Sequence, residues 1–303
     1  MPRKVIVRLK GGLGNQLFCY AAARRLSLVN DAELVLDTVS GFEFDHIYKR
    51  TYSLAGFSIP ARLATPQERM EPFGRVRRLF ARKLSESKPL DRRRYIQQIG
   101  VDFNPNIISL RLQEGTTYFD PFGQSEGYFA DIRKELQQDL VMSVPSNLNN
   151  LEMVEKIKST DSVALHVRWF DSGDGVHSSN MSQAYYQQAI PNMLTQVPEA
   201  HFFVFSDQPD QTEALLSPIM AGRPFTLVRH NAEKRNADAD FWLMHQCRHF
   251  IIGNSTFAWW AAWLGEHRHT GARVFAPARF IDPHTNVTAW GFPGLLPDRW
   301  TAL

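Results

Sequence analysis

The sequence contains few cysteines: Cys19 and Cys247 are the only two among 303 residues. So few thiols exclude a fold held together by disulfides and favour a reducing compartment. No apolar run approaches the ~20 residues that span a bilayer, and the opening residues MPRKVIVRLK lack the apolar core of a signal peptide. Hydrophobic residues make up 44% and charged residues 21%, as in globular chains. We therefore expect a cytoplasmic protein.

An overall excess of one charge is also missing, since the net charge is only +3. The positive charge is concentrated in residues 62–94, which hold eleven Lys or Arg against four Asp or Glu. Within this segment the apolar residues fall near helical spacing, with arginines between them: Phe73, Val76, Leu79, Phe80 and Leu84. Such a helix could touch an anionic lipid or an acidic glycan carrier, or simply pack on its own domain with its arginines in water. No nucleic-acid-binding motif accompanies the charge, so we expect no nucleic acid partner.

Short apolar strands alternate with helical segments along most of the chain, which predicts parallel α/β sheets. We expect an N-terminal α/β domain over residues 1–147 and a C-terminal Rossmann-like domain over 148–303, with a polar linker near 143–153. Two doubly wound domains would face a central cleft, where open α/β sheets bind ligands. Predicted strands are 4–9, 33–38, 95–99, 116–120, 162–169, 201–206, 225–230, 249–254 and 273–278. Predicted helices are 13–29, 128–140, 182–196, 210–217, 238–247 and 255–265.

Several motifs of metal and nucleophilic chemistry are absent. His245 and His249 are spaced i,i+4, but QCR between them lacks the glutamate of a metalloprotease motif. The DAD sequence at 238–240 begins a predicted helix and does not end a strand, and no nucleophile elbow occurs. The sequence therefore gives little support for metal-dependent chemistry.

A glycine-rich turn, LKGGLGNQLF, follows the first predicted strand. It fails the dinucleotide pattern, because Leu17 stands where the third glycine belongs, and it lacks the Gly-Lys-Ser/Thr of a P-loop. Glycines still let backbone N–H groups approach an anion at a helix N-terminus. Asn15 and Gln16 add amide groups suited to sugar hydroxyls. The turn could equally serve packing alone.

Polar residues end three strands of the second predicted domain. His166 and Arg168 share one side of a strand by period-two alternation, and Arg168 could pair with a diphosphate or with an internal carboxylate. Asp207 could accept hydrogen bonds from guanine or ribose, or cap a helix. Ser255 and Thr256 open a helix whose N–H groups suit phosphate oxygens. The alanine-rich context of Trp259, Trp260 and Trp263 indicates core packing.

With these stretches in order, the sequence resembles the bacterial α-1,2-fucosyltransferase family, relatives of the blood-group H fucosyltransferases. The matching segments are GGLGNQLFCYAAARRL, FGQSEGYFADIRKEL, VALHVRWFD, FFVFSDQPD and FIIGNSTFAWWAAWL. The resemblance implies a GT-B fold, GDP-fucose as donor, a galactose-containing glycan as acceptor, inversion at the anomeric carbon, and no metal ion. A fucosyltransferase of another linkage, a transferase of another GDP-sugar, and a non-catalytic GDP-sugar-binding protein remain alternatives.

One position departs from the family pattern. The central motif usually reads His-x-Arg-Arg-x-Asp, but Trp169 replaces the second arginine. By the resemblance Arg168 would hold the β-phosphate, and alternation would point Trp169 away from it. We expect Arg168, Asp171 and Asn15 to be catalytic; donor contacts from Gly11, Gly12, Gly14, Gln16, His166, Arg168, Asp207, Asn254, Ser255, Thr256 and Phe257; and acceptor contacts from Asn15, Trp169, Asp174 and His177. Asp171, Asp174 and His177 are the candidate bases.

Overall fold

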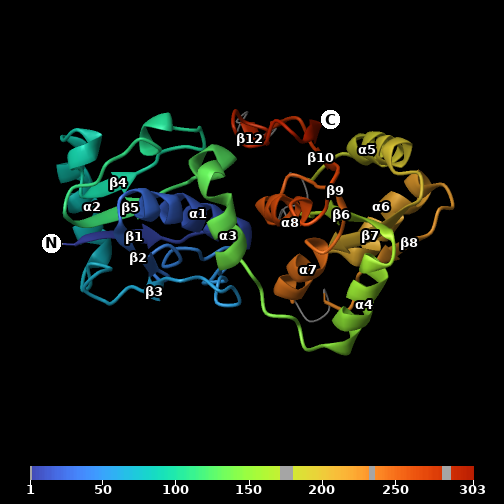
Figure 1. The fold of residues 1–303 in the computed structure, drawn as a ribbon, viewed down its shortest axis with the longest axis horizontal. Helices are drawn as coiled ribbons and strands as arrows, with labels where there is room; N and C mark the ends of the chain where they lie inside the picture. Colours follow the sequence, from blue (N-terminus) through green and yellow to red (C-terminus); the bar gives the residue numbers. More distant parts are fainter. Residues whose placement is uncertain (1, 171–179, 232–235, 282–287) are drawn as a thin grey trace. The chain divides into compact units, whose positions relative to one another are not determined.

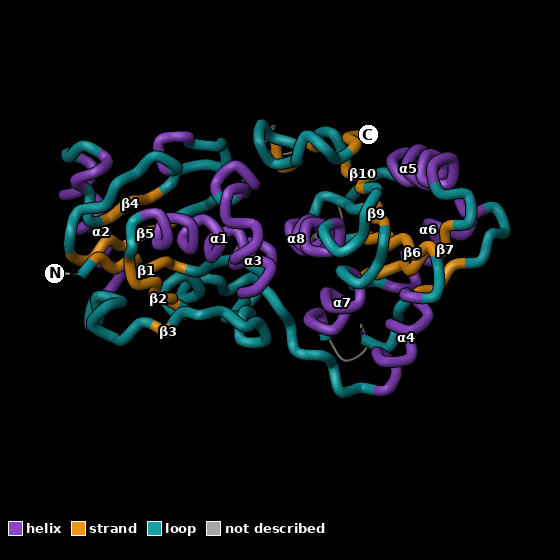
Figure 2. Tube along the Cα trace, viewed as in Figure 1, coloured by secondary structure: helices purple, strands orange, loops and turns teal. Residues whose placement is uncertain are grey.

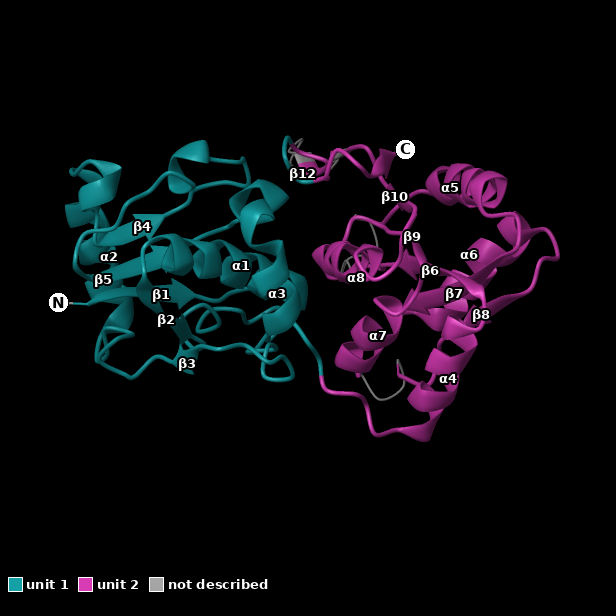
Figure 3. Cartoon of the chain, viewed as in Figure 1, with its two compact units in different colours: residues 1–142, 293–295 teal, residues 143–292, 296–303 magenta. Residues whose placement is uncertain are grey.

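A computed structural model describes residues 2–170, 180–231, 236–281 and 288–303 (Figure 1). The chain divides into two compact units (Figure 3): residues 1–142 with 293–295, and residues 143–292 with 296–303. Helices and strands alternate through both (Figure 2). Each unit is a parallel α/β sheet with helices on both faces, so the predicted GT-B type fold class is confirmed.

Unit 1 is built on a five-stranded parallel sheet in the order β3-β2-β1-β5-β4. Helix α1 covers one face, and α2 packs on the other, where Ala81 meets the cluster around Ile6, Tyr95 and Tyr118. The strand order reverses between β1 and β5, so their carboxyl ends flank a crevice. The elements are β1 (Arg3–Arg8), α1 (Leu13–Val29), β2 (Ala32–Asp37), β3 (Arg62–Leu63), α2 (Gly74–Glu86), η1 (Leu90–Arg92), β4 (Tyr95–Gln97), η2 (Pro105–Ile107), β5 (Gly115–Asp120), η3 (Glu126–Tyr128), η4 (Ala130–Ile132) and α3 (Arg133–Asp139).

Unit 2 has a six-stranded parallel sheet in the order β13-β10-β9-β6-β7-β8. Read from β8, this is the doubly wound order of a dinucleotide-binding sheet, with its switch point between β6 and β9. The elements are α4 (Leu148–Lys158), β6 (Asp161–Val167), α5 (Gln183–Gln196), β7 (Ala200–Ser206), α6 (Pro209–Met220), β8 (Phe225–Leu227), α7 (Ala237–Met244), β9 (His249–Ile251), α8 (Thr256–Glu266), β10 (Val274–Ala276) and β13 (Thr301–Ala302), with a separate antiparallel pair of β11 (Phe280–Ile281) and β12 (Thr288–Trp290).

The faces of the unit 2 sheet follow from strand alternation. Val163, Leu165 and Val167 of β6 point into a core shared with α5 and α6. On the opposite face α4, α7 and α8 lie together (Figure 1). Helix α8 is apolar on nearly all sides and its three tryptophans are fully buried, which confirms their predicted packing role.

Two sequence-based predictions of local structure were wrong. The amphipathic helix expected over 128–140 becomes two 3₁₀ turns, and α3 begins only at Arg133. The Ser125 hydroxyl accepts the Gly127 N–H and caps the first of these turns. The polar stretch 143–153, expected as a linker, is helical from Leu148. The Asn147 side chain accepts the Asn149 N–H there (2.9 Å) and starts α4.

Candidate active site

The candidate site of unit 2 lies at the carboxyl ends of three adjacent strands. Strand β6 pairs with β7 through Val167↔Ser206 and with β9 through Leu165↔Ile251. The residues that follow these strand ends therefore meet at the edge of the sheet. This edge includes the switch point of the strand order, where open α/β sheets bind ligands.

Arg168, just past β6, forms an ion pair with Asp207, just past β7. The second Asp207 oxygen accepts the backbone N–H of Trp169 (3.0 Å). Both charged side chains remain partly exposed, and the guanidinium lies 5.5 Å from the centroid of the Phe170 ring. The Asp207 carboxylate thus fixes both the side chain of Arg168 and the backbone N–H of Trp169. The exposed part of the Arg168 guanidinium group faces solvent.

The Trp169 side chain points the other way. Its indole N–H donates to the Thr212 hydroxyl (2.8 Å), which bonds to the Ser206 hydroxyl (2.7 Å). The ring packs against the core that β6 shares with α5 and α6. The alternation argument is confirmed, and the side chain fastens the end of β6 to α6. The ring remains half-buried, and the acceptor contact expected from Trp169 stays a prediction.

His166 lies on the opposite face of β6 and is buried. Its ring is 5.8 Å from that of Phe257. Burial, and secondarily the positive charge of Arg168, lowers the pKa of His166 from 6.5 to about 3, so the ring is neutral near pH 7. Its Nδ1 atom has no hydrogen-bond partner among the described residues. A buried nitrogen of this kind is a ready contact for a ligand group.

The turn after β9 leads into the N-terminus of α8. Ser255 is the N-cap, but its side chain makes no capping hydrogen bond. The first amides of α8 therefore keep the orphan donors of a helix start, and no acidic residue occupies the first turn. Asn254, Ser255, Thr256 and Phe257 are all half-buried. A helix start with free amides suits an anion, and the donor contacts expected from these four residues stay predictions.

One polar group at this edge escaped sequence reasoning. Asp240 in the first turn of α7 accepts a hydrogen bond from Asn231 (2.9 Å). Burial raises the pKa of its carboxyl to about 7, against the effect of that bond. The neighbouring Phe241 packs edge-on against Phe257 (5.2 Å), so α7 supports the start of α8. The only sequence signal was a DAD triplet at a helix start, which usually means a helix N-terminus.

In unit 1 the glycine turn connects β1 to α1. Gly11 has φ +74°, and a Cβ there would lie 2.7 Å from Asn15 Nδ2, so only glycine fits. Gly12 is the N-cap of α1 without a side-chain bond, and Gly14 is buried in its first turn. Asn15 is half-buried and its Oδ1 accepts a hydrogen bond from Gln124 (2.9 Å).

Gln16 is fully buried. Its amide nitrogen donates to the carbonyls of Gly11 and Thr51 (2.9 Å each), and its oxygen accepts the Ser53 N–H (2.9 Å). The expected donor contact from Gln16 is not met, because this amide ties the glycine turn to residues 51–53. The carboxylate of Asp207 binds Arg168 and the Trp169 N–H, and the N-cap of α6 is Gln208. The donor contact expected from Asp207 stays a prediction.

Some predicted residues fall elsewhere. Asp171, Asp174 and His177 lie outside the described residues. Across the described ranges, no group of three or more His, Cys, Asp or Glu side chains could hold a metal ion. A membrane-crossing helix is likewise not found in the part of the chain that the structure covers.

Residues 106–276 match Glycosyl transferase family 11. This segment is more than half of the chain and contains β6, β7, β9 and α8. The chain belongs to Glycosyl transferase family 11. It is therefore a glycosyltransferase, and the family resemblance that its motifs indicated is confirmed.

Two curated relatives come from Escherichia coli. An alpha-1,2-colitosyltransferase is 26% identical over 265 residues, covering 86% of this chain and 87% of the relative. The O-antigen biosynthesis glycosyltransferase WbnK is 28% identical over 279 residues, covering 84% and 88%. The sequence similarity to these two glycosyltransferases thus extends over most of the chain.

Solved structures support the fold. FUT1 of Arabidopsis thaliana, a mutant in complex with GDP, matches with a TM-score of 0.52 at 12% identity, over 95% of this chain and 72% of that one. NodZ alpha-1,6-fucosyltransferase soaked with GDP-fucose matches with a TM-score of 0.50 at 16% identity, over 87% and 93%. At this identity the likeness concerns the fold.

Proposed function

We propose that this glycosyltransferase moves L-fucose from GDP-fucose to a hydroxyl of a galactose-containing glycan, the 2-hydroxyl of galactose being the first choice. Membership of family 11 supports the reaction class. The observation that carries the proposal is Arg168, held by Asp207 at the sheet edge beside the α8 N-terminus. A fixed guanidinium and helix amides together suit a diphosphate leaving group.

The proposed reaction is a single inverting displacement. An acceptor oxygen attacks the anomeric carbon, the bond from that carbon to the β-phosphate oxygen breaks with its electron pair, and GDP leaves. The negative charge that grows on GDP would be stabilised by Arg168 and by the first amides of α8, in place of a metal ion. His166, kept neutral by burial, can offer its Nδ1 to the donor without adding charge.

The acceptor proton needs a base. Asp171, Asp174 and His177 follow the end of β6 in the sequence, and we retain Asp171 as the first choice because it completes the family motif. Asn15 in unit 1 is our candidate for orienting the acceptor, since its Oδ1 is engaged by Gln124 and its amide nitrogen can donate.

A second donor has a specific observation in its favour. One relative is named a colitosyltransferase, and colitose is fucose without its 3-hydroxyl. GDP-colitose is therefore the competing donor at the same site. The two donors differ only in one hydrogen-bonding group, so Arg168 and α8 would serve both.

The test uses the purified full chain with GDP-fucose or GDP-colitose, a panel of galactose-terminated glycans, and parallel reactions with and without EDTA. We expect transfer from GDP-fucose that EDTA does not reduce, with an α-linked product by proton NMR. A higher kcat/KM with GDP-colitose would select the second donor. GDP-sugar binding without turnover on any acceptor would support the non-catalytic alternative.

A further inference from the structure

Helix α2 in unit 1 presents its apolar face to solvent. Phe73, just before the helix, is 80% exposed, Phe80 is 66% exposed and Leu84 is 67% exposed, and Val76 and Leu79 are also exposed. Phe73, Val76, Phe80 and Leu84 recur at spacings of three and four residues, so they form one stripe along the helix. Together with the adjacent Leu79, these side chains are called the α2 stripe.

The inner face of α2 has the opposite character. Its buried residues are Gly74, Arg78 and Ser85. Arg78 is held inside by the Glu43 carboxylate (3.0 Å) and the Arg69 carbonyl (3.0 Å). An ordinary surface helix buries its apolar side and exposes its polar one. Helix α2 departs from this pattern, because its large apolar side chains lie outside while the small Ala81 packs on the cluster around Ile6, Tyr95 and Tyr118. Such an outer face indicates a partner.

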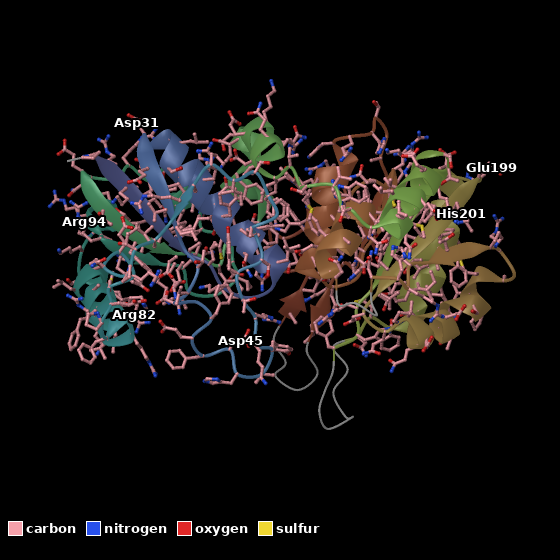
Figure 4. The ribbon with its side chains drawn as sticks, turned by 90° about the horizontal axis from the view of Figure 1, so that it is seen from below. Asp31, Asp45, Arg82, Arg94, Glu199 and His201 are labelled. Atoms are coloured by element: carbon pink, nitrogen blue, oxygen red, sulfur yellow. The ribbon has the colours of Figure 1, made fainter. Side chains whose placement is uncertain are left out.

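Positive charge lies beside the α2 stripe. Arg75, Arg77 and Lys83 are exposed, and Figure 4 labels Arg82 on the same helix. The Arg75 guanidinium lies over the Phe44 ring (4.8 Å to the centroid), and among the described residues no carboxylate lies within ion-pair distance of it. The neighbouring segment 88–94 adds Lys88, Arg92 and Arg94, all exposed.

A basic pocket of about 520 Å³ adjoins the stripe. Val76 and Leu79 line it together with Arg75 and Arg82. Arg82 donates to Gln97 Oε1 (3.0 Å), which also lines the pocket, and its guanidinium pairs with Glu86 (3.5 Å). Apolar side chains and arginines therefore share one opening, as an acyl chain and its phosphate headgroup would require.

We propose that α2 docks unit 1 on an anionic phospholipid surface, with the α2 stripe in the acyl boundary and Arg75, Arg82 and Lys83 against the phosphates. A second copy of the chain fits less well, because two such helices would bring their basic flanks together. The proposal is independent of the donor sugar, and its test needs no turnover.

The experiment is vesicle co-sedimentation of the full chain. Vesicles of phosphatidylcholine alone are compared with vesicles that also contain phosphatidylglycerol. The wild type should sediment with the anionic vesicles only, and less so as salt is raised. Phe80→Ser with Leu84→Ser should lower the partition coefficient by about tenfold or more, and Arg75→Gln with Lys83→Gln should do likewise.

Matched controls use exposed residues elsewhere. Val144→Ser with Leu148→Ser changes two exposed apolar side chains, and Lys134→Gln with Lys156→Gln removes two exposed charges; both should bind as the wild type does. The proposal is overturned if the wild type ignores anionic vesicles, if the α2 variants still bind, or if the controls lose as much. Sedimentation equilibrium showing a dimer that Phe80→Ser with Leu84→Ser abolishes would assign the stripe to a second copy instead.

Discussion

Arg168 and Asp207 form an ion pair across the carboxyl ends of two neighbouring parallel strands, β6 and β7. Asp207 also accepts the N–H of the residue after Arg168. The cation is thereby oriented before any donor arrives, which lowers the reorganisation that a phosphate contact would otherwise require. The proposed mechanism depends on this pair.

Replacing Arg168 by alanine should lower kcat by 10²–10³, about 2.7–4 kcal/mol of transition-state stabilisation, by analogy with loss of one oxyanion-hole donor. The measurement is steady-state transfer from the active GDP-sugar. Arg168→Lys should recover part of the rate, because it keeps the charge but loses the fork. The exposed Arg223→Gln serves as control; turnover of Arg168→Ala equal to that control would remove Arg168 from the reaction.

Asp207→Asn should lower kcat/KM by about tenfold while preserving an acceptor for the Trp169 N–H. The loss acts through Arg168, so the double variant Arg168→Ala with Asp207→Asn should be scarcely slower than Arg168→Ala alone. Additive losses in this cycle would mean that Asp207 contacts the donor directly, as guanine or ribose recognition requires.

Trp169→Arg restores the arginine of the family pattern, yet we expect it to destabilise the protein by about 2 kcal/mol or more. It puts a guanidinium against the apolar core of β6, α5 and α6. Trp169→Phe should cost only about 1 kcal/mol, for the hydrogen bond to Thr212. Urea unfolding measures both. An unchanged stability together with a faster Trp169→Arg enzyme would contradict the packing role.

The buried His166 and the half-buried Asp240 should give opposite pH dependence. The folded pKa of His166 is about 3, below its usual 6.5, so the unfolded chain binds a proton first and the free energy of unfolding falls as pH drops from 6.5 toward 3. The folded pKa of Asp240 is about 7, above its usual 3.8. The carboxyl therefore adds to the free energy of unfolding at low pH, and this stabilisation is lost as pH rises from 3.8 to 7.

Urea unfolding at pH 7 and pH 5 separates these effects. His166→Gln should remove about 2 kcal/mol of the stability lost on going to pH 5, since each pH unit is worth about 1.4 kcal/mol. Asp240→Asn should remove a gain in the free energy of unfolding, also about 2 kcal/mol, that the wild type shows on going from pH 7 to pH 5. Identical pH dependence in the wild type and both variants would contradict burial of these groups.

Gln16→Ala should destabilise unit 1 by about 2–3 kcal/mol, because it leaves the buried partners at Gly11, Thr51 and Ser53 unsatisfied. Asn15→Ala, one residue away but half-buried, should change stability little and acceptor KM more. Thermal unfolding and acceptor titrations distinguish the two. Equal stability of both variants would contradict a stabilising role for the hydrogen bonds of the Gln16 side chain.

The sequence predicted the features that local pattern controls. The alternation of apolar runs and helices gave both parallel sheets, and α1 ends at Val29 as expected. Period-two alternation correctly separated Arg168 from Trp169 on opposite sides of the strand end. These outcomes depend on residues close together in the chain, where spacing carries the information.

The contacts that sequence reasoning missed join distant residues. Trp169 meets Thr212 across 43 positions, and Gln16 meets Ser53 across 37. Neither partner is marked by its type, since threonine and serine occur throughout the chain. The burial of Asp240 depends on how α7 packs on its neighbours, which a DAD triplet does not encode. Tertiary context decides such roles.

The contrast between Trp169 and the tryptophans of α8 has an optical consequence. Trp259, Trp260 and Trp263 are sealed from water, so their fluorescence should stay blue-shifted until the chain unfolds. Trp169 is half-buried, with its backbone N–H on Asp207 and Arg168 as its neighbour in sequence. Trp242, Trp290 and Trp300 are also buried. Occupancy of the donor site should therefore change mainly the emission of the half-buried Trp169, against a background from six buried tryptophans.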